Sequence, residues 1–253
     1  MGDNSDIAGE AAIVTGAAQG IGRGVAHMLA EAGVKIVIGD IQPADRTVSE
    51  VRGMGGEAVS MVMDTSRPRE AEALVDLAVE EYGRLDILVN NAGIDAPRGN
   101  AWDLPDEEWR RVIDVNVSGV FYCSRAALRP MMEVGKGFIV NMSSQAARVG
   151  EPGMSPAYNA SKAALLGMTM EFALQVADKG IRVVALMPGA IDSREPGWSE
   201  ERKAEVLLEY PLGIGTPRDI GEMVRRLASP ASRWVSGTAV QLTGGYQRGS
   251  GWF

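Results

Sequence analysis

Short runs of apolar and β-branched residues alternate along the chain with longer segments of helical period. Most of the short runs are apolar at consecutive positions, which is typical of strands that a parallel sheet buries on both faces. The predicted strands cover residues 11–15, 35–39, 58–63, 86–89, 137–142, 181–187 and 238–242. Strands that alternate with helices predict β-α-β units. We therefore expect one α/β domain over residues 1–253, with a mostly parallel sheet of seven strands and helices on both faces.

Glycine and proline mark the ends of the predicted helices. A helix over residues 21–32 ends at Gly33, and a helix over residues 67–82 ends at Gly83. Glycine is favoured after a helix because it adopts the left-handed conformation without strain. Another helix begins at Ser155-Pro156, an N-cap followed by a first-turn proline, and runs to about residue 178.

The regular alternation stops between residues 190 and 216, where prolines and glycines surround a short helical stretch over 199–210. A long irregular loop after the carboxyl end of a strand is more often a cover for a binding site than a linker between domains. We call residues 190–216 the lid segment and expect it to close over a substrate.

Composition excludes several classes of protein. The net charge of −8 argues against binding along a nucleic-acid backbone, which requires clustered Lys and Arg. Cys123 has no second cysteine with which to form an internal disulfide. The first residues are polar and acidic, unlike a signal peptide, and no apolar run is long enough to span a bilayer. We expect a cytoplasmic protein without a membrane or nucleic-acid partner.

A glycine-rich turn follows the first predicted strand directly and opens the next helix. Its sequence is Thr15-Gly16-Ala17-Ala18-Gln19-Gly20-Ile21-Gly22. Glycines allow the backbone to approach a pyrophosphate, whose charge the amides and the dipole at the helix N-terminus stabilise. The position of the turn, between a strand and a helix, predicts a dinucleotide site.

The second predicted strand is followed by Asp40, where a dinucleotide fold places the acid that accepts hydrogen bonds from the adenosine ribose. A carboxylate there repels the additional phosphate of NADP, and Ala17, Ala18 and Gln19 carry no positive charge to attract it. These residues predict NAD as the cofactor.

Tyr158 and Lys162 are four positions apart in the helix that begins after Ser155, so their side chains project from one face. A free phenol has a pKa of about 10 and is a weak base at neutral pH. A nearby ammonium group and the positive nicotinamide ring stabilise the phenolate. We expect Tyr158 to exchange a proton with an alcohol or ketone while the nicotinamide exchanges a hydride.

The chain resembles the classical short-chain dehydrogenase/reductase family over nearly its whole length. The resemblance rests on the glycine-rich turn and on motifs that occur in the order of the family, with similar spacing: Asn90-Asn91-Ala92-Gly93, Asn116, Ser143-Ser144, Tyr158-x-x-x-Lys162, Pro188-Gly189 and Thr243-Gly244-Gly245. Each motif alone is common, whereas the combination is specific. The resemblance implies a doubly wound Rossmann-type sheet of seven mostly parallel strands in the order 3-2-1-4-5-6-7. It also implies a metal-independent oxidoreductase acting on CH–OH groups.

The resemblance also implies roles for individual residues. Ser144, rather than Ser143, would stabilise charge on the reacting oxygen, Lys162 would hold the nicotinamide ribose, and Asn116 would interrupt its helix and position a water that links Lys162 to solvent. The implied cofactor contacts are Gly16, Gln19, Gly20, Ile21, Gly22, Asp40, Ile41, Asp64, Thr65, Asn91, Ala92, Gly93, Tyr158, Lys162, Pro188, Gly189, Ile191 and Ser193.

Other functions fit the sequence less well. A Ser-His-Asp hydrolase would need His27, which lies on the helix after the glycine turn, and one His with one Cys is a poor set of zinc ligands. A regulator that senses dinucleotide without catalysis would not need Ser144, Tyr158 and Lys162. A 3-ketoacyl carrier-protein reductase is the main alternative enzyme. Arg129 matches its carrier-docking position, but Leu174 stands at the second basic position.

The substrate is the least defined part of the prediction. Three loops beyond the strand ends each carry an arginine, Arg98, Arg148 and Arg194, which suggests a small anionic substrate or, equally, a solvated surface. Gln145 and Trp198 are further candidates and leave sugars and polyols open, with a ketone or lactone as product. The resemblance implies a homotetramer or a dimer, formed through the two long helices that flank the Ser144 strand.

Overall fold

The protein forms one seven-stranded sheet in the order β3-β2-β1-β4-β5-β6-β7 in a computed structural model that describes residues 6–150, 154–193 and 195–246. All neighbouring strands are parallel. The strands are β1 (Ala11–Thr15), β2 (Lys35–Asp40), β3 (Ala58–Val62), β4 (Ile87–Asn90), β5 (Gly137–Met142), β6 (Ile181–Pro188) and β7 (Thr238–Leu242). The predicted strand order is confirmed, and no predicted strand end is displaced by more than one residue.

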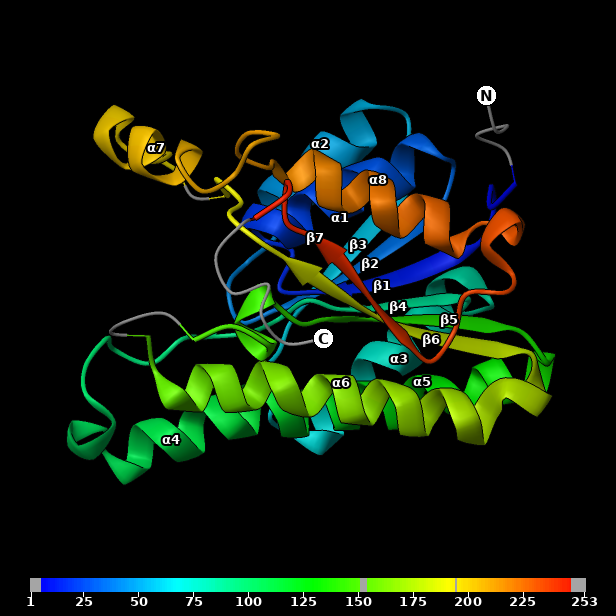
Figure 1. Ribbon diagram of the computed structural model, residues 1–253. Coiled ribbons are helices and arrows are strands. Elements are labelled where there is room, and N and C mark those ends of the chain that lie inside the picture. The colour runs from blue at the N-terminus through cyan, green and yellow to red at the C-terminus, as the bar shows by residue number, and fades with distance from the viewer. Residues whose placement is uncertain (1–5, 151–153, 194, 247–253) are drawn as a thin grey trace.

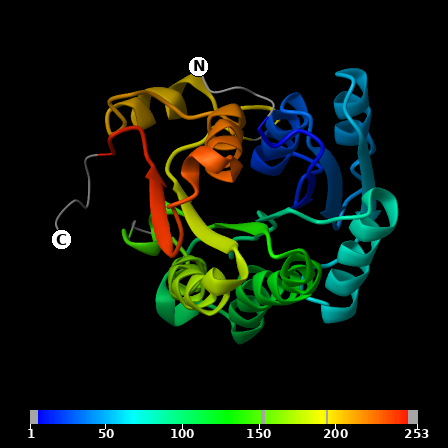
Figure 2. The same cartoon turned by 90° about the vertical axis from the view of Figure 1, so that its right-hand side faces the viewer.

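Helices cover both faces of this sheet (Figure 1), and Figure 2 shows the same layers from the side. One layer contains α1 (Gly20–Glu31), α2 (Asp45–Gly53) and α8 (Pro217–Ala228). The opposite layer contains α3 (Pro68–Tyr82), α4 (Asp106–Ile113), α5 (Gly119–Val134) and α6 (Pro156–Val176). No helix among the described residues is both long enough and apolar enough to cross a membrane.

The central strands are apolar at consecutive positions because each face of the sheet has its own core. Val14 faces the layer of α1 and α8, where it joins a cluster that contains Val25 and Val224. Its neighbour Ile13 joins the cluster of the opposite layer, with Ala127 and other residues of α5. Since successive side chains of a strand point to opposite faces, both must be apolar. This packing fixes the carboxyl ends of the strands at one edge.

The lid segment begins after β6 and returns to its starting point before α8. Ile191 and Gly215 form an isolated parallel bridge, in which the amide of Asp192 donates to the carbonyl of Gly215 at 3.0 Å. The helix within it, α7 (Glu200–Leu207), projects beyond the sheet edge (Figure 1). It ends before the predicted residue 210, because Tyr210 precedes a proline and such residues disfavour helix.

Candidate active site

The glycine-rich turn lies between β1 and α1 and leaves no room for side chains. Gly16 and Gly20 adopt φ values of +66° and +61°. A Cβ on Gly22 would lie 2.3 Å from the carbonyl oxygen of Gly16. Gln19 is the N-cap of α1, and its side chain makes no hydrogen bond to the first turn. The amides of that turn therefore remain suited to an anion such as a pyrophosphate, which is the group that the motif predicts.

The segment after β4 supports this turn directly. The hydroxyl of Thr15 accepts hydrogen bonds from the amides of Asn91 and Ala92, both at 3.0 Å. The side-chain amide of Asn91 donates to the carbonyls of Thr15 and Gly16, both at 2.9 Å. The side chain of Asn91 thus braces the glycine turn, and Gly93 is an exposed residue two positions further on.

The carboxylate of Asp40 lies beside the turn at the end of β2. It accepts hydrogen bonds from the amides of Ala18 at 2.8 Å and Gln42 at 3.0 Å. The next residue, Ile41, is 65% exposed and presents an apolar surface beside this carboxylate. These positions suit the hydroxyl groups of a ribose and the face of an adenine ring.

Asp64 and Thr65 follow β3 at the same edge. The carboxylate of Asp64 accepts hydrogen bonds from the amide and hydroxyl of Ser66, at 2.9 and 2.7 Å. Thr65 is buried against α5, since a Cβ on Gly119 would lie 2.9 Å from its hydroxyl oxygen. Asp64 is half-buried and is the nearer of the two to solvent.

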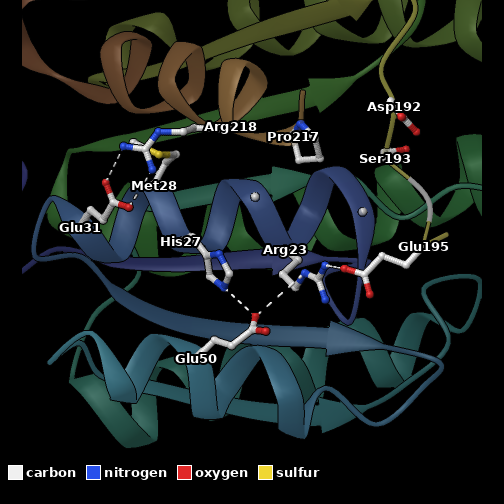
Figure 3. Close-up of a pocket in the computed structure, with 12 residues that line it drawn as sticks. Arg23, His27, Met28, Glu31, Glu50, Asp192, Ser193, Glu195, Pro217 and Arg218 are labelled. Carbon is white, nitrogen blue, oxygen red and sulfur yellow. Dashed lines mark hydrogen bonds and ion pairs between the residues drawn. The ribbon is translucent and has the colours of Figure 1, made fainter. Parts of the chain in front are cut away.

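An ion-pair network links the start of the lid segment to α1 and α2. Glu195 contacts the guanidinium group of Arg23 and lies 2.7 Å from that of Arg46. Figure 3 shows Arg23 and His27 both directed toward Glu50, and His27 Nε2 lies 3.0 Å from that carboxylate. Both guanidinium groups of this network are thus already paired with carboxylates.

The catalytic candidates meet at the ends of β5 and α6. The side chains of Ser144 and Tyr158 share a hydrogen bond. The Lys162 Nζ lies 5.6 Å from the centre of the Tyr158 ring and donates to the carbonyl of Met142 at 2.8 Å. The hydroxyl of Ser143 instead donates to the backbone carbonyl of Lys162 at 2.8 Å, which fastens β5 to α6. Of the two serines, Ser144 is therefore the one directed at Tyr158.

Burial changes the acidity of both groups. It raises the pKa of the Tyr158 phenol above its usual value, although the hydrogen bond with Ser144 acts in the opposite direction. It lowers the pKa of the Lys162 ammonium to about 8. The sequence predicts a phenol made more acidic by Lys162, whereas in the protein alone desolvation has the larger effect because it disfavours the charged form.

Asn116 lies in a π-helical turn, residues 114–118, between α4 and α5, which is the predicted interruption of the helix. Its side-chain oxygen accepts from the amide of Ile94 at 2.8 Å, and its side-chain nitrogen donates to the carbonyl of Ile94 at 2.9 Å. The same nitrogen donates to the hydroxyl of Ser161, next to Lys162. A π turn of this kind often marks a functional position in a helix.

The chain that follows β6, at the start of the lid segment, lies against the glycine turn. Pro188 is the last residue of β6, and the Gly189 amide donates to the carbonyl of Leu242 at 2.9 Å. A Cβ on Gly20 would lie 3.3 Å from the Ser193 carbonyl oxygen. Ser193 therefore lies next to the glycine turn, whereas Ile191 packs against the core cluster of α1 and α8 and pairs with Gly215.

The predicted substrate residues are less closely grouped. Arg98 and Arg148 are exposed, and Trp198 is half-buried, with its backbone amide bonded to the carboxylate of Asp192 at 3.1 Å. Gln145 is buried and donates to the hydroxyl of Tyr210 at 2.6 Å. Arg194 lies outside the described residues.

Two residues at this site escaped the sequence analysis. The exposed carboxylate of Asp95 adds to the rise in the pKa of Tyr158 and partly offsets the larger lowering of the Lys162 pKa by burial. Tyr210 reaches the site from the lid segment. The glycine motif just before Asp95 could have indicated the first, but no periodic pattern marks the second. Among the described residues, no group of three His, Cys, Asp or Glu side chains is placed to hold a metal ion.

Comparison with known proteins identifies the family. The model of the family described as enoyl-(acyl carrier protein) reductase matches residues 16–247. The cis-4-hydroxycyclohexanecarboxylate dehydrogenase of Sinomonas cyclohexanicum is 39% identical, over 93% of this chain and 95% of that protein. The 3-oxoacyl-[acyl-carrier-protein] reductase of Staphylococcus aureus (strain N315) is 36% identical, over 93% and 97%. The chain belongs to the short-chain dehydrogenase/reductase family.

A solved structure extends the likeness to three dimensions. A 7α-hydroxysteroid dehydrogenase in complex with NADH and 7-oxo glycochenodeoxycholic acid matches with a TM-score of 0.90 at 35% identity, over 97% of each chain. The present short-chain dehydrogenase/reductase is accordingly an oxidoreductase that acts on hydroxyl groups and uses a nicotinamide dinucleotide.

Proposed function

We propose that the protein is an NAD-dependent dehydrogenase of secondary alcohols on saturated rings, in which Tyr158 is the general acid–base. The observation that carries this proposal is the shared hydrogen bond of the Ser144 and Tyr158 side chains beside the buried Lys162. Two hydroxyl groups at one point match the single oxygen of an alcohol or ketone. The amide-rich turn at the start of α1 fits the pyrophosphate of the dinucleotide.

Each residue then has a defined task. The bound dinucleotide supplies a hydride acceptor for oxidation and a hydride donor for reduction. Tyr158 takes the hydroxyl proton of the alcohol, and Ser144 donates a hydrogen bond to the oxygen as negative charge develops on it. Protonated Lys162 stabilises the phenolate. Asn116 holds Ile94, next to the Gly93 that borders Lys162, and would position a water that links Lys162 to solvent. Reduction of a ketone follows the same steps in reverse.

Two features favour NAD over NADP. Asp40 lies where a 2′-phosphate would have to approach a carboxylate, and such an approach is repulsive. Arg23 in α1 and Arg46 in α2, two cations on the helices beside the turn, are engaged by Glu50 and Glu195. An NADP enzyme would need one of them to leave its carboxylate.

The relatives narrow the class of substrate. One relative is named for a hydroxycyclohexanecarboxylate, and the matching solved structure contains a steroid acid. Both molecules carry an oxygen on a saturated ring and an acidic group at a distance. The exposed guanidinium groups of Arg98 and Arg148 suit such an acid. A ring alcohol with a carboxylate is therefore the substrate class that the residues and relatives favour together.

The 3-ketoacyl carrier-protein reductase is the second candidate, since one such reductase is 36% identical to this chain. Arg129, the position at which a carrier would dock, shares a groove between α3 and α5 with the carboxylates of Glu72, Asp76, Glu80 and Glu133. Leu174 is 77% exposed and carries no charge. Asp40 opposes NADPH. These residues disfavour an acidic carrier and hence this reaction.

Initial rates with matched substrates test the proposal. Purified protein with NAD should form NADH with cis-4-hydroxycyclohexanecarboxylate faster than with cyclohexanol, which has the ring and hydroxyl without the acid. NADP should replace NAD poorly. A faster reaction of NADPH with a 3-ketoacyl thioester would favour the second candidate. Binding of NADH with no turnover of any alcohol or ketone would favour a dinucleotide-sensing regulator.

Assembly into a dimer or tetramer through α5 and α6 is part of the proposal. Phe121, Met132, Met170 and Leu174 are exposed apolar residues on these two helices. By contrast, Leu165 of α6 is fully buried in the protein core and is not available to such an interface. Light scattering over a range of concentrations measures the state directly.

A further inference from the structure

Tyr210 occupies an unusual place in the lid segment. The lid residues on either side of it in sequence, Leu208 and Leu212, are 84% and 85% exposed, whereas Tyr210 is 6% exposed. Its ring lies 4.9 Å from that of Tyr246 in the segment after β7. An inward-facing tyrosine between two solvent-exposed leucines marks the point at which the lid segment attaches to the body of the protein.

Tyr210 contacts the residue that follows Ser144, the serine of the proposed active site. Gln145 Nε2 donates to the Tyr210 hydroxyl oxygen at 2.6 Å, across 65 positions of sequence. Gln145 directly follows Ser144, whose hydroxyl shares a hydrogen bond with Tyr158. A chain of two hydrogen bonds and one peptide link therefore joins the lid segment to the proposed general acid–base.

Close packing holds this contact in place. A Cβ on Gly189, at the end of β6, would lie 2.9 Å from both the Gln145 side-chain oxygen and the Cε1 of Tyr210. The backbone amide of Leu212 donates to the carbonyl of Gly244 at 3.0 Å just beyond the tyrosine. The side chains of Gln145 and Tyr210 therefore lie close to the backbone of Gly189, in space that a side chain at that position would fill. Loss of the hydrogen bond between them would release the end of the lid segment.

We propose that Tyr210 is a positioning residue that holds the lid segment closed against the Ser144 loop and so sets the affinity for the alcohol. This inference rests on the proposed function for its kinetic part. Substrate would bind productively when the lid is closed, so a smaller closed fraction raises the apparent KM in proportion. The opposite end of the lid is held separately, by Glu195 on Arg23 and Arg46, so dinucleotide binding should change little.

The test compares Tyr210→Phe with Gln145→Met and with the double variant. Each single variant should raise KM for cis-4-hydroxycyclohexanecarboxylate about tenfold with kcat changed less than about threefold, and the double variant should add nothing further. Tyr82→Phe is the matched control, because it also removes a tyrosine hydroxyl, but one that donates to the backbone carbonyl of Ile36, far from the site. Its KM should equal that of the wild type.

Hydrogen exchange in the free protein separates this inference from the proposed function. Backbone amides of residues 200–213 should exchange about tenfold faster in Tyr210→Phe and Gln145→Met than in the wild type, while the Kd for NADH stays within about twofold. Unchanged exchange in both variants, or additive effects in the double variant, would overturn the inference. If the two variants exchange faster than the wild type as expected, but the wild type oxidises no alcohol, the proposed function is wrong while the role of Tyr210 in holding the lid segment is supported. Should Tyr210→Phe fold poorly, Gln145→Met measures the same contact from its other side.

Discussion

The two sides of the strand edge are built in different ways. On the dinucleotide side, the glycine turn is bonded by Thr15 and Asn91, and a methyl group on Gly22 would overlap the backbone. On the alcohol side, Arg98 and Arg148 lie exposed on loops. There, the side-chain amide of Gln145 donates a hydrogen bond to Tyr210 of the lid segment. The first side is packed into the fold, whereas the second can change its side chains with little effect on the sheet.

This difference predicts that substrate specificity resides on the alcohol side. The reacting group sits at the boundary, since Tyr158 lies on the rigid helix α6 and Ser144 begins the loop on the alcohol side. A change on the dinucleotide side should therefore affect every substrate alike. A change on the alcohol side should alter the ranking of substrates. The following predictions test that division.

The largest effect is expected at the boundary. Tyr158→Phe removes the group that exchanges the proton, and kcat should fall about a thousandfold, within the range for general acid–base catalysis. The loss should be equal for ring alcohols with and without a carboxylate. NADH affinity, followed by fluorescence titration, should stay within about twofold. Full turnover by this variant would contradict the role of Tyr158.

Gly22→Ala tests the packed side. The new Cβ would lie 2.3 Å from the Gly16 carbonyl oxygen and 2.6 Å from the Asn91 side-chain nitrogen, so the turn must move. Overpacking of this kind costs about 1–3 kcal/mol, and NADH affinity should fall about 30-fold. Gly53→Ala is the control, because nothing lies within 4 Å of the added atom and the residue is in helix α2. It should bind NADH normally and be slightly more stable. Normal NADH binding by Gly22→Ala would show that the turn tolerates a side chain.

The buried Lys162 predicts a dependence of stability on pH. Its pKa is about 8 in the folded protein, against about 10.4 for an unperturbed lysine. Between these values the unfolded chain binds more protons, so the free energy of unfolding should rise with pH, by about 2 kcal/mol from pH 7 to 9.5. Urea denaturation of the wild type and of Lys162→Met measures the difference. The variant should lack this rise, and equal slopes would contradict the lowered pKa.

The accuracy of sequence-based prediction follows the same division. All seven strands were predictable because β1 and its neighbours must be apolar on both faces, and residues such as Gly83 have the left-handed φ that their position requires. The order of the strands followed from the family resemblance and not from these patterns. The Asp40 and Tyr158 positions followed from motifs of short range. In contrast, Tyr210 meets Gln145 across 65 residues through irregular loops. No local propensity encodes such a contact. The proximity of Asp95 to Lys162 is likewise not encoded by any local pattern.

The two adjacent serines show what a sequence motif can and cannot determine. The Ser143-Ser144 pair lies at the end of β5, where successive side chains point in opposite directions. One hydroxyl must then face α6 and the other the open edge, but spacing to Tyr158 alone does not say which. The hydrogen bond from Ser143 to the Lys162 carbonyl decides it.

The smallest expected effect concerns the choice of cofactor and tests whether one charge on the packed side sets it. Asp40→Asn keeps an oxygen that can accept the amide of Ala18, so the turn should persist, while the negative charge is removed. We expect kcat/KM for NADP to rise about tenfold and that for NAD to fall a few fold, since a lost repulsion of this size is worth about 1.4 kcal/mol. Asp45→Asn, an exposed residue in the first turn of α2, removes the same charge nearby and should change neither value. If both variants raised the NADP rate equally, general electrostatics would explain the preference, and the contact at Asp40 would not. If neither did, the ion pairs of Arg23 and Arg46 would be the remaining barrier to the phosphate, and Glu195→Gln would then be the variant that admits it.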